Sequence, residues 1–142
     1  MRSGLTQIPV FGSPDPAIEY RPRQAAYALI KDPKGRVAAV KGHSRYFLPG
    51  GGSLPGETPE GTVHREVREE LGRDVRIARR IGEAVQYFFA EGQHYRMRAV
   101  FFAAEFISEA AGAREHELHW LEPKELERAF FHQSHAWAAS RS

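Results

Sequence analysis

One segment in the middle of the chain is marked as a helix at both of its ends. Thr58 suits the N-cap, Pro59 suits the first helical position, and Gly72 is a natural C-terminal stop. Between them, apolar residues recur every four positions and form one narrow stripe: Val63, Val67 and Leu71. The chain must therefore fold so that this stripe packs against other elements.

The segments around this helix are strand-like. Five segments rich in apolar, β-branched or aromatic residues predict strands: 25–30, 37–40, 75–90, 96–107 and 118–121. Turn signals at 32–35 and 91–93 predict hairpins. Residues 123–131 and 134–139 predict one or two further helices that point Leu126, Phe130 and Trp137 inward. The pattern favours a mixed sheet with helices packed on it.

The first 20 residues predict an irregular arm. Proline and glycine interrupt any regular pattern there, at positions 9, 12, 14 and 16. Phe11 and Tyr20 are the residues that could still pin this arm to the core.

The composition excludes several kinds of chemistry. The chain has no cysteine, so disulfides, thiolate catalysis and cysteine zinc sites are ruled out. A formal net charge of +2 gives no argument for a nucleic-acid or membrane partner. No segment reads as a signal peptide or is apolar over a bilayer's thickness. We expect a single domain over residues 1–142, cytoplasmic, monomeric or homodimeric, with a small-molecule partner and neither nucleic acid nor membrane.

Three carboxylates crowd the helix face beside the apolar stripe. Glu66, Glu69 and Glu70 are three and four residues apart, a spacing at which like charges repel. A hard divalent cation such as Mg²⁺ would compensate this repulsion, because it takes oxygen ligands and leaves positions for substrate phosphate oxygens. A glutamate-rich helix on its own is more often a solvated face, so the loop that precedes it matters.

That loop agrees with a ligand site. Gly50-Gly51-Gly52 lets the backbone approach a ligand closely and offers its own carbonyls. Glu57 ends the loop, where it could hold Arg65 or a metal-bound water. The loop, the glutamate and the capped helix together are far more specific than any one of them.

The order of these residues resembles the signature box of the Nudix hydrolases, Gly51-x5-Glu57-x7-Arg65-Glu66-Val67-x-Glu69-Glu70-x-Gly72. Every fixed position of the box matches. The one departure is Arg73, where the family usually has an aliphatic residue, and we expect looser packing at that end of the helix. The flanking strand pattern is also similar to the family fold over most of the chain.

The resemblance implies an α/β fold of the α+β kind, an α/β/α sandwich with a mixed sheet. It also implies a Mg²⁺-dependent pyrophosphohydrolase, for which Mn²⁺ can replace Mg²⁺. The substrate would be a nucleoside di- or triphosphate or another nucleoside diphosphate derivative, attacked at phosphorus by an activated water. No second motif names the nucleoside.

The resemblance assigns roles by position. Glu66 and Glu70 look like the principal metal ligands, with Glu69 a ligand or base and the Gly50 carbonyl a further ligand. Arg65 is similar to the arginine that orients the carboxylates.

Glu57 then resembles the partner of that arginine. Many family members recruit another carboxylate from outside the box as base or ligand. Glu115 is the first candidate here and Glu117 the second, although a solvated loop glutamate is an equally good interpretation.

Other residues carry weaker signals. Arg23 is a candidate for phosphate contact, and Phe47 and Tyr87 are candidates for stacking on a base, while surface exposure or core packing would explain them equally. His132 and His135 predict surface or capping residues.

Two competing functions remain. One is a non-catalytic Nudix-like domain that senses a nucleotide, although such domains typically lose box carboxylates that this chain keeps. The other is a nucleic-acid-binding module, supported only by a basic isoelectric point.

Overall fold

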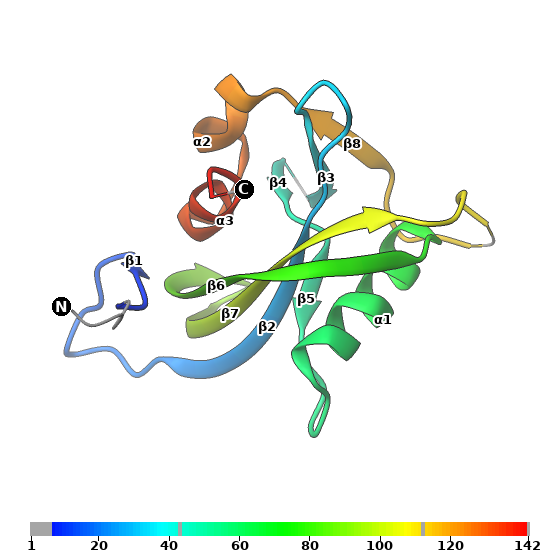
Figure 1. Ribbon diagram of the computed structural model, residues 1–142. Helices are drawn as coiled ribbons and strands as arrows, with labels where there is room; N and C mark the ends of the chain where they lie inside the picture. Colours follow the sequence, from blue (N-terminus) through cyan, green and yellow to red (C-terminus); the bar gives the residue numbers. More distant parts are fainter. Residues whose placement is uncertain (1–6, 43, 112, 142) are drawn as a thin grey trace, which may run out of the picture.

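The computed structural model describes residues 7–42, 44–111 and 113–141, so the first six residues of the predicted arm lie outside the described part. The centre is a five-stranded mixed sheet in the spatial order β1-β6-β7-β2-β5 (Figure 1). Its strands are β1 Val10–Phe11, β2 Arg21–Leu29, β5 Gly50–Gly52, β6 Val75–Ala90 and β7 Gln93–Phe106. A three-stranded sheet in the order β4-β3-β8 lies beside it, built from β3 Val37–Gly42, β4 Arg45–Phe47 and β8 Leu118–Leu121.

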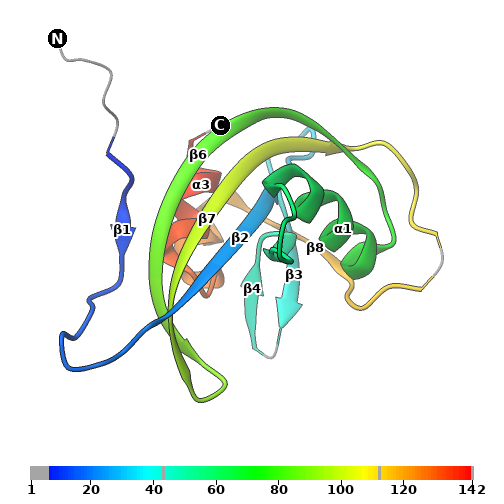
Figure 2. The same ribbon diagram turned by 90° about the horizontal axis from the view of Figure 1, so that it is seen from below.

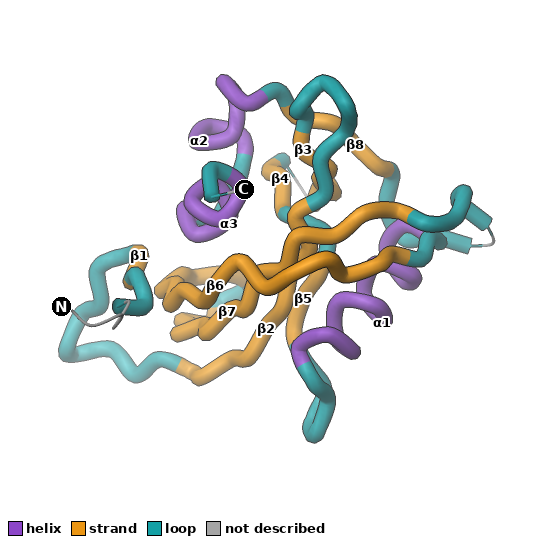
Figure 3. The backbone as a smooth tube through the Cα atoms, viewed as in Figure 1, coloured by secondary structure: helices purple, strands orange, loops and turns teal. Residues whose placement is uncertain are grey.

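Helices cover both faces of the large sheet (Figures 1 and 3). They are α1 Pro59–Leu71, the short 3₁₀ turn Pro123–Glu125, α2 Leu126–Ala129 and α3 Gln133–Ala139. The α1 side buries one cluster that contains Val63, Val67 and Leu71, and the α2–α3 side buries another that contains Leu126, Phe130 and Ala138. The expected α/β/α sandwich with a mixed sheet is confirmed. No helix in the described ranges is long and apolar enough to cross a membrane.

The sheet combines parallel and antiparallel pairs. β2 runs parallel to β7, and β1 runs parallel to β6. β6 and β7 form an antiparallel hairpin, and β5 runs antiparallel to β2. Figure 2 shows that β6 and β7 curve together, and their pairing register shifts twice between Ile77 and Gly82. Such irregularities increase local bending and twist.

Several predicted elements match closely, and others differ in extent or type. The helix begins and ends as predicted, and β6 and β8 have the expected bounds. β2 begins four residues earlier than the predicted strand, because residues 21–24 are exposed and belong to the strand through pairing with β7 rather than through apolar side chains. The Gly50–Gly52 segment is a short strand rather than a loop.

The N-terminal arm is less irregular than predicted. Val10 and Phe11 form a two-residue strand beside β6, and the Val85 N–H donates to the Pro9 carbonyl at 2.9 Å. Phe11 packs on Trp137, with ring centroids 6.1 Å apart. Tyr20, predicted as the second pin, contacts the ring of Tyr87 at 5.0 Å.

Candidate active site

Capping fixes where the carboxylates of α1 stand. The Thr58 hydroxyl accepts the Gly61 N–H at 3.0 Å, and Gly72 ends the helix with a left-handed φ of 64°. The apolar stripe is completely buried under the sheet. The neighbouring stripe of the helix therefore faces β5, whose three residues are all glycine, and it brings Glu66 and Glu70 against this glycine strand.

The glycine strand accommodates both carboxylates. A Cβ at Gly51 would overlap the carboxylate of Glu66, so any larger residue there would require the end of that side chain to move. The Gly50 N–H donates to Glu70 Oε1 at 3.0 Å. Gly50 has a φ of 141° and packs so closely on β2 that a Cβ would overlap the Ala26 carbonyl. Glycine is thus required at 50 for backbone approach, and at 51 it leaves the Glu66 carboxylate in place.

Arg65 joins the loop to the helix. Its Nε donates to Glu57 Oε2 at 2.8 Å and its Nη2 to Glu57 Oε1 at 3.0 Å, a two-point contact. Nη2 also donates to the Gly52 carbonyl at 2.9 Å, and Nη1 donates to Glu69 Oε1 at 3.2 Å. The hydrogen bonds from Arg65 are the main reason that the pKa of Glu57 is lowered to about 2. Glu57 therefore holds Arg65, as the sequence suggested.

The two carboxyls that face β5 have raised pKa values. Burial is the main cause in both cases, and it raises the pKa of Glu66 to about 7 and that of Glu70 to about 8. Arg65 opposes the rise at Glu66, and the Gly50 N–H opposes it at Glu70. The negative charges of the neighbouring glutamates add to the rise at both positions.

These carboxylates match a hard cation in donor chemistry. Their oxygens are partly withdrawn from water and repel one another, and a bound divalent ion would relieve both costs. The three glutamates do not converge on one point, however, because Glu69 is turned toward Arg65. Within the described ranges, no three histidine, aspartate or glutamate side chains are grouped closely enough to hold a metal ion.

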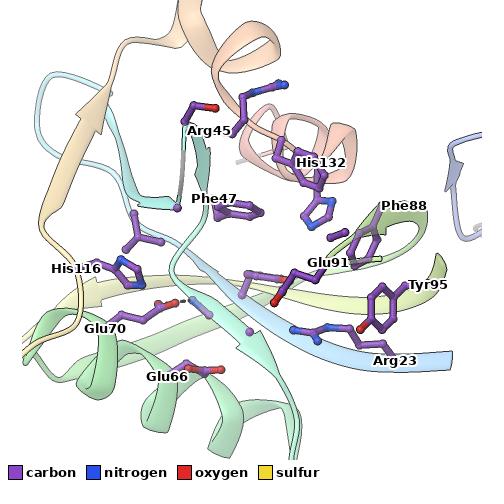
Figure 4. A pocket seen from close by; sticks show the side chains of 18 of the residues that line it. Arg23, Arg45, Phe47, Glu66, Glu70, Phe88, Glu91, Tyr95, His116 and His132 are labelled. Atoms are coloured by element: carbon purple, nitrogen blue, oxygen red, sulfur yellow. Dashed lines mark hydrogen bonds between the residues drawn. The ribbon is translucent and has the colours of Figure 1, made fainter. Parts of the chain in front are cut away.

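Glu66 and Glu70 line a cavity of about 590 Å³ (Figure 4). The cavity extends from the acidic face of α1, past Gly50 and Gly51, to aromatic side chains of β4, the β6–β7 hairpin and the segment before α3. Arg23 of β2 also lines it. The site is therefore acidic at one end and aromatic at the other.

The aromatic end is a continuous row of rings. His132 lies 5.5 Å from Phe47 and 4.6 Å from Phe88, and Phe88 stacks on Tyr95 at 5.1 Å, all between ring centroids. The guanidinium of Arg23 lies 5.9 Å from the Tyr95 ring. Burial lowers the pKa of His132 to about 3, so the ring is neutral at ordinary pH.

The prediction that His132 and His135 are surface residues is wrong, because His132 is 3% exposed and His135 is fully buried. His132 does occupy the N-cap position of α3, but its side chain makes no capping hydrogen bond there. The cause of their burial is docking of the C-terminal segment on distant strands. The Phe131 N–H donates to the Tyr46 carbonyl at 2.9 Å, and the Ser134 N–H donates to the Gln86 side chain at 2.9 Å. Nothing in the local sequence signals these contacts.

Of the three predicted substrate residues, Arg23 and Phe47 line the cavity and Tyr87 does not. Tyr87 lies on the opposite face of β6, against Tyr20, and accepts a hydrogen bond from Arg96 Nε at 3.2 Å. Its neighbour Phe88 faces the cavity instead. The strand alternation that separates them was available in the sequence, but which face carried the site was not.

The loop before β8 is tied to the end of α1. The Glu115 N–H donates to the Glu69 carbonyl at 3.1 Å, and the His116 N–H donates to the Glu70 carbonyl at 2.9 Å. The charge of Glu115 contributes to the raised pKa of both Glu66 and Glu70. Glu115 thus lies within electrostatic reach of the acidic face, although its side chain is exposed and is absent from the cavity lining.

Arg73 does not loosen the end of the helix in the way the sequence suggested. Its guanidinium carbon lies 3.9 Å from the centre of the Phe106 ring, and its Nε donates to the Ser108 carbonyl at 3.0 Å. The arginine covers an aromatic surface as an aliphatic residue would, and it adds a hydrogen bond.

Comparison with known proteins decides the family. The sequence model of the NUDIX domain matches residues 21–140. The chain belongs to the Nudix family. It is a Nudix hydrolase. Nudix enzymes generally use divalent metal ions.

Solved Nudix structures share the fold. A MutT Nudix hydrolase from Burkholderia pseudomallei is 26% identical, with 85% of this chain and 98% of that chain covered and a TM-score of 0.68. A MutT protein from Methanosarcina mazei Go1 is 21% identical, with coverage of 88% and 95% and a TM-score of 0.67. An ADP-ribose pyrophosphatase from Streptococcus suis is 17% identical, with coverage of 85% and 93% and a TM-score of 0.63. No curated protein matches the sequence.

Proposed function

We propose that this Nudix hydrolase is Mg²⁺-dependent and cleaves the diphosphate linkage of a nucleoside di- or triphosphate or a related nucleoside diphosphate derivative. The observation that carries the proposal is the cavity that Glu66 and Glu70 share with a row of aromatic rings. A metal–diphosphate centre needs the two carboxylates, and the row of aromatic rings suits a planar nucleobase. Arg23 adds a cation with no ion pair among the described residues.

We assign the metal to Glu66 and Glu70, with Glu69 and the Gly50 carbonyl as additional ligands, and Mn²⁺ as a substitute for Mg²⁺. When bound, the ion neutralises diphosphate oxygens and makes the attacking water more acidic. The two-point contact from Arg65 to Glu57 keeps the arginine in place beside this group.

The proton of the attacking water needs an acceptor. Glu115 is our first choice for this base, because its charge reaches Glu66 and Glu70 and its backbone is tied to α1. Glu69 is the alternative inside the box, and its contact with Arg65 lowers its availability. Attack of the water oxygen on phosphorus forms one P–O bond and breaks the bridging P–O bond, so the two halves of the diphosphate separate.

The cavity suggests an orientation for the substrate. The nucleobase of the substrate would stack on the rings of Phe47 and Phe88, with His132 between them, while the diphosphate lies near Glu66. Arg23, above Tyr95, would contact a phosphate or a ribose hydroxyl. Tyr87, our earlier candidate, has no part in this arrangement.

The test is a substrate screen with purified protein and Mg²⁺. The screen includes nucleoside triphosphates, ADP-ribose and nucleoside diphosphate sugars; two of the solved structures are named as an ADP-ribose pyrophosphatase and a UDP-X diphosphatase. Release of a nucleoside monophosphate from at least one substrate is expected, and Glu66→Gln is the matched inactive control. A screen in which no nucleotide is cleaved with either Mg²⁺ or Mn²⁺ would refute the proposal.

The other expectations remain predictions: a single domain over residues 1–142, a monomer or homodimer, in the cytoplasm, with no nucleic-acid or membrane partner.

A further inference from the structure

The segment between β4 and β5 is held in place from several sides. It consists of Leu48, Pro49 and the first residue of β5, Gly50, whose carbonyl the proposed function assigns to the metal. The Ala28 N–H of β2 donates to the Pro49 carbonyl at 2.8 Å. The Gly50 N–H donates to Glu70 Oε1 on α1 at 3.0 Å.

The third support comes from the other side of the sheet. The Leu48 N–H donates to Nδ1 of His135, in α3, at 3.0 Å. Both partners are fully buried, so no water competes for this hydrogen bond. The distant C-terminal helix is thereby connected to the segment two residues before Gly50.

An imidazole is an unusual choice for this position. The ring of His135 is surrounded by aromatic side chains, the nearest being Tyr27 with centroids 4.2 Å apart. Because Nδ1 accepts a hydrogen bond, the ring is neutral and its proton is on Nε2. Among the described residues Nε2 has no hydrogen-bond partner, which is a cost for a buried polar atom.

An apolar residue would fill this space without that cost. It would lack an acceptor for the Leu48 N–H. That hydrogen bond is the one that the His135 side chain makes among the described residues. The histidine is therefore explained by the position of the 48–50 segment rather than by packing.

We propose that His135 is a positioning residue for the metal site, because its Nδ1 holds Leu48 and so sets where the Gly50 carbonyl stands relative to Glu70. This inference rests on the proposed function, in which Gly50 and Glu70 are metal ligands. His135 itself touches neither the metal nor the substrate. Its effect is carried through the backbone of residues 48–50.

The experiment compares three substitutions by Mg²⁺ titration without substrate. His135→Phe keeps a ring in the aromatic surroundings and removes the acceptor. His135→Leu removes the acceptor with a smaller side chain, in case the phenylalanine does not fit. His135→Asn keeps an acceptor near the position of Nδ1 and loses the ring. The readouts are the melting temperature without metal and the Mg²⁺ concentration that gives half of the maximal thermal shift.

We expect the substitutions to affect the Mg²⁺ affinity and the melting temperature without metal differently. His135→Phe and His135→Leu should need about tenfold or more Mg²⁺ for half of the shift, the usual scale when a residue supporting a metal ligand is lost. His135→Asn should stay within a few-fold of wild type even if its melting temperature falls. Phe130→Leu is the packing control, since Phe130 is buried beside His135 at 5.8 Å and makes no side-chain hydrogen bond to the 48–50 segment. It should lower the melting temperature and leave the Mg²⁺ midpoint unchanged.

Three results would overturn the inference, and they distinguish its failure from that of the proposed function. If wild type responds to Mg²⁺ and the Phe and Leu variants have the same midpoint, the positioning role is wrong and the proposed function stands. The same follows if the Asn variant is as weak as the other two. If wild type does not respond to Mg²⁺ or Mn²⁺, the proposed metal site is wrong, and the inference fails with it.

Discussion

The carboxylate of Glu66 occupies the space where a side chain at Gly51 would stand. The backbone of Gly51 does not have the positive φ that favours glycine, so a larger residue here would act by moving the Glu66 carboxylate. The Glu66 carboxylate therefore fills the space between β5 and α1 at this point. This contact makes Gly51 a direct probe of the position of Glu66.

Gly51→Ala should displace Glu66 while the fold is retained. We expect kcat to fall by about tenfold or more, the scale for loss of metal-site support, and the protein to lose only about 0.5–1.5 kcal/mol of stability, the scale for forcing one side chain off its preferred rotamer. A double-mutant cycle with Glu66→Ala is the control. The stability cost of Gly51→Ala should largely disappear when Glu66 is truncated, and additive costs would show that the contact is not the cause.

Mg²⁺ should raise the melting temperature of the protein. A ligand that binds only the folded state at 100 times its Kd stabilises it by about 2.7 kcal/mol. Glu66→Gln and Glu70→Gln should each weaken this response, as measured by differential scanning calorimetry. Glu60→Gln, an exposed change in the first turn of the same helix, is the matched control and should respond like wild type. An unchanged wild-type melting curve at saturating Mg²⁺ contradicts the assignment.

The stability of the metal-free protein should depend on pH through Glu66 and Glu70. Their folded-state pKa values of about 7 and about 8 exceed the ordinary value of 4.5, so the folded state holds these protons more tightly. Their contribution to the free energy of unfolding is therefore full below pH 4.5 and is lost as pH rises through about 7 to 8. His132 and His135 act oppositely, because their lowered pKa values reduce stability as pH falls below 6.5.

Glu70→Gln isolates the carboxyl from the histidines. The variant should resemble wild type near pH 5, where Glu70 is protonated, and should become the more stable of the two near pH 8 without metal. Denaturant unfolding at both pH values measures the difference. A difference that does not change with pH would argue against the raised pKa of Glu70.

Arg65→Lys should impair activity although the charge is kept. A lysine cannot make the two-point contact with Glu57 and also reach the Gly52 carbonyl, so Glu57 and the loop lose their anchor. We expect a fall of about tenfold to a hundredfold in kcat/KM, the scale for a residue that supports a metal ligand. Arg68→Lys, on the exposed side of the same helix, should stay near wild type. Equal activity of Arg65→Lys and wild type would remove Arg65 from the machinery.

Glu115→Gln tests the assignment of the base. If Glu115 takes the proton, kcat should fall by roughly a hundredfold or more and should partly recover at higher pH, where hydroxide replaces the base. Glu117→Gln is the neighbouring control, because Glu117 lines a separate hollow with Arg73 and Arg114. Activity of Glu115→Gln within a few-fold of wild type would leave Glu69 as the leading base.

The sequence predicted the helix and its carboxylates well because their signals are local. Thr58, Pro59 and Gly72 act within one helical turn of the residues that they cap, and the spacing of Glu66 and Glu70 follows from helix geometry alone. The contact from Arg65 to Glu57 was also predictable, since a family pattern records it. These features require no knowledge of the sheet.

The aromatic end of the cavity could not be predicted in the same way. Phe88 and Tyr95 face the site because β6 and β7 pair in one register, and a shift by one residue would have presented Tyr87 instead. His132 and His135 are buried by contacts with Tyr46, Gln86 and Leu48, all far away in sequence. Long-range docking, rather than local preference, decides their environment.

The outer edge of β6 has a consequence for how the molecules behave in concentrated solution. β6 spans Val75–Ala90, yet β1 pairs with it only at Val85 and Gln86 within the described residues. Unpaired strand edges can recruit the edge of another molecule, and charged side chains oppose this. Arg76, Arg79 and Arg80 are exposed along the uncovered half. Arg76 and Arg80 form ion pairs with Glu105 and Glu83, so this edge carries solvated charges of both signs. We expect such an edge to disfavour strand-to-strand aggregation because pairing with another molecule would remove these charges from water.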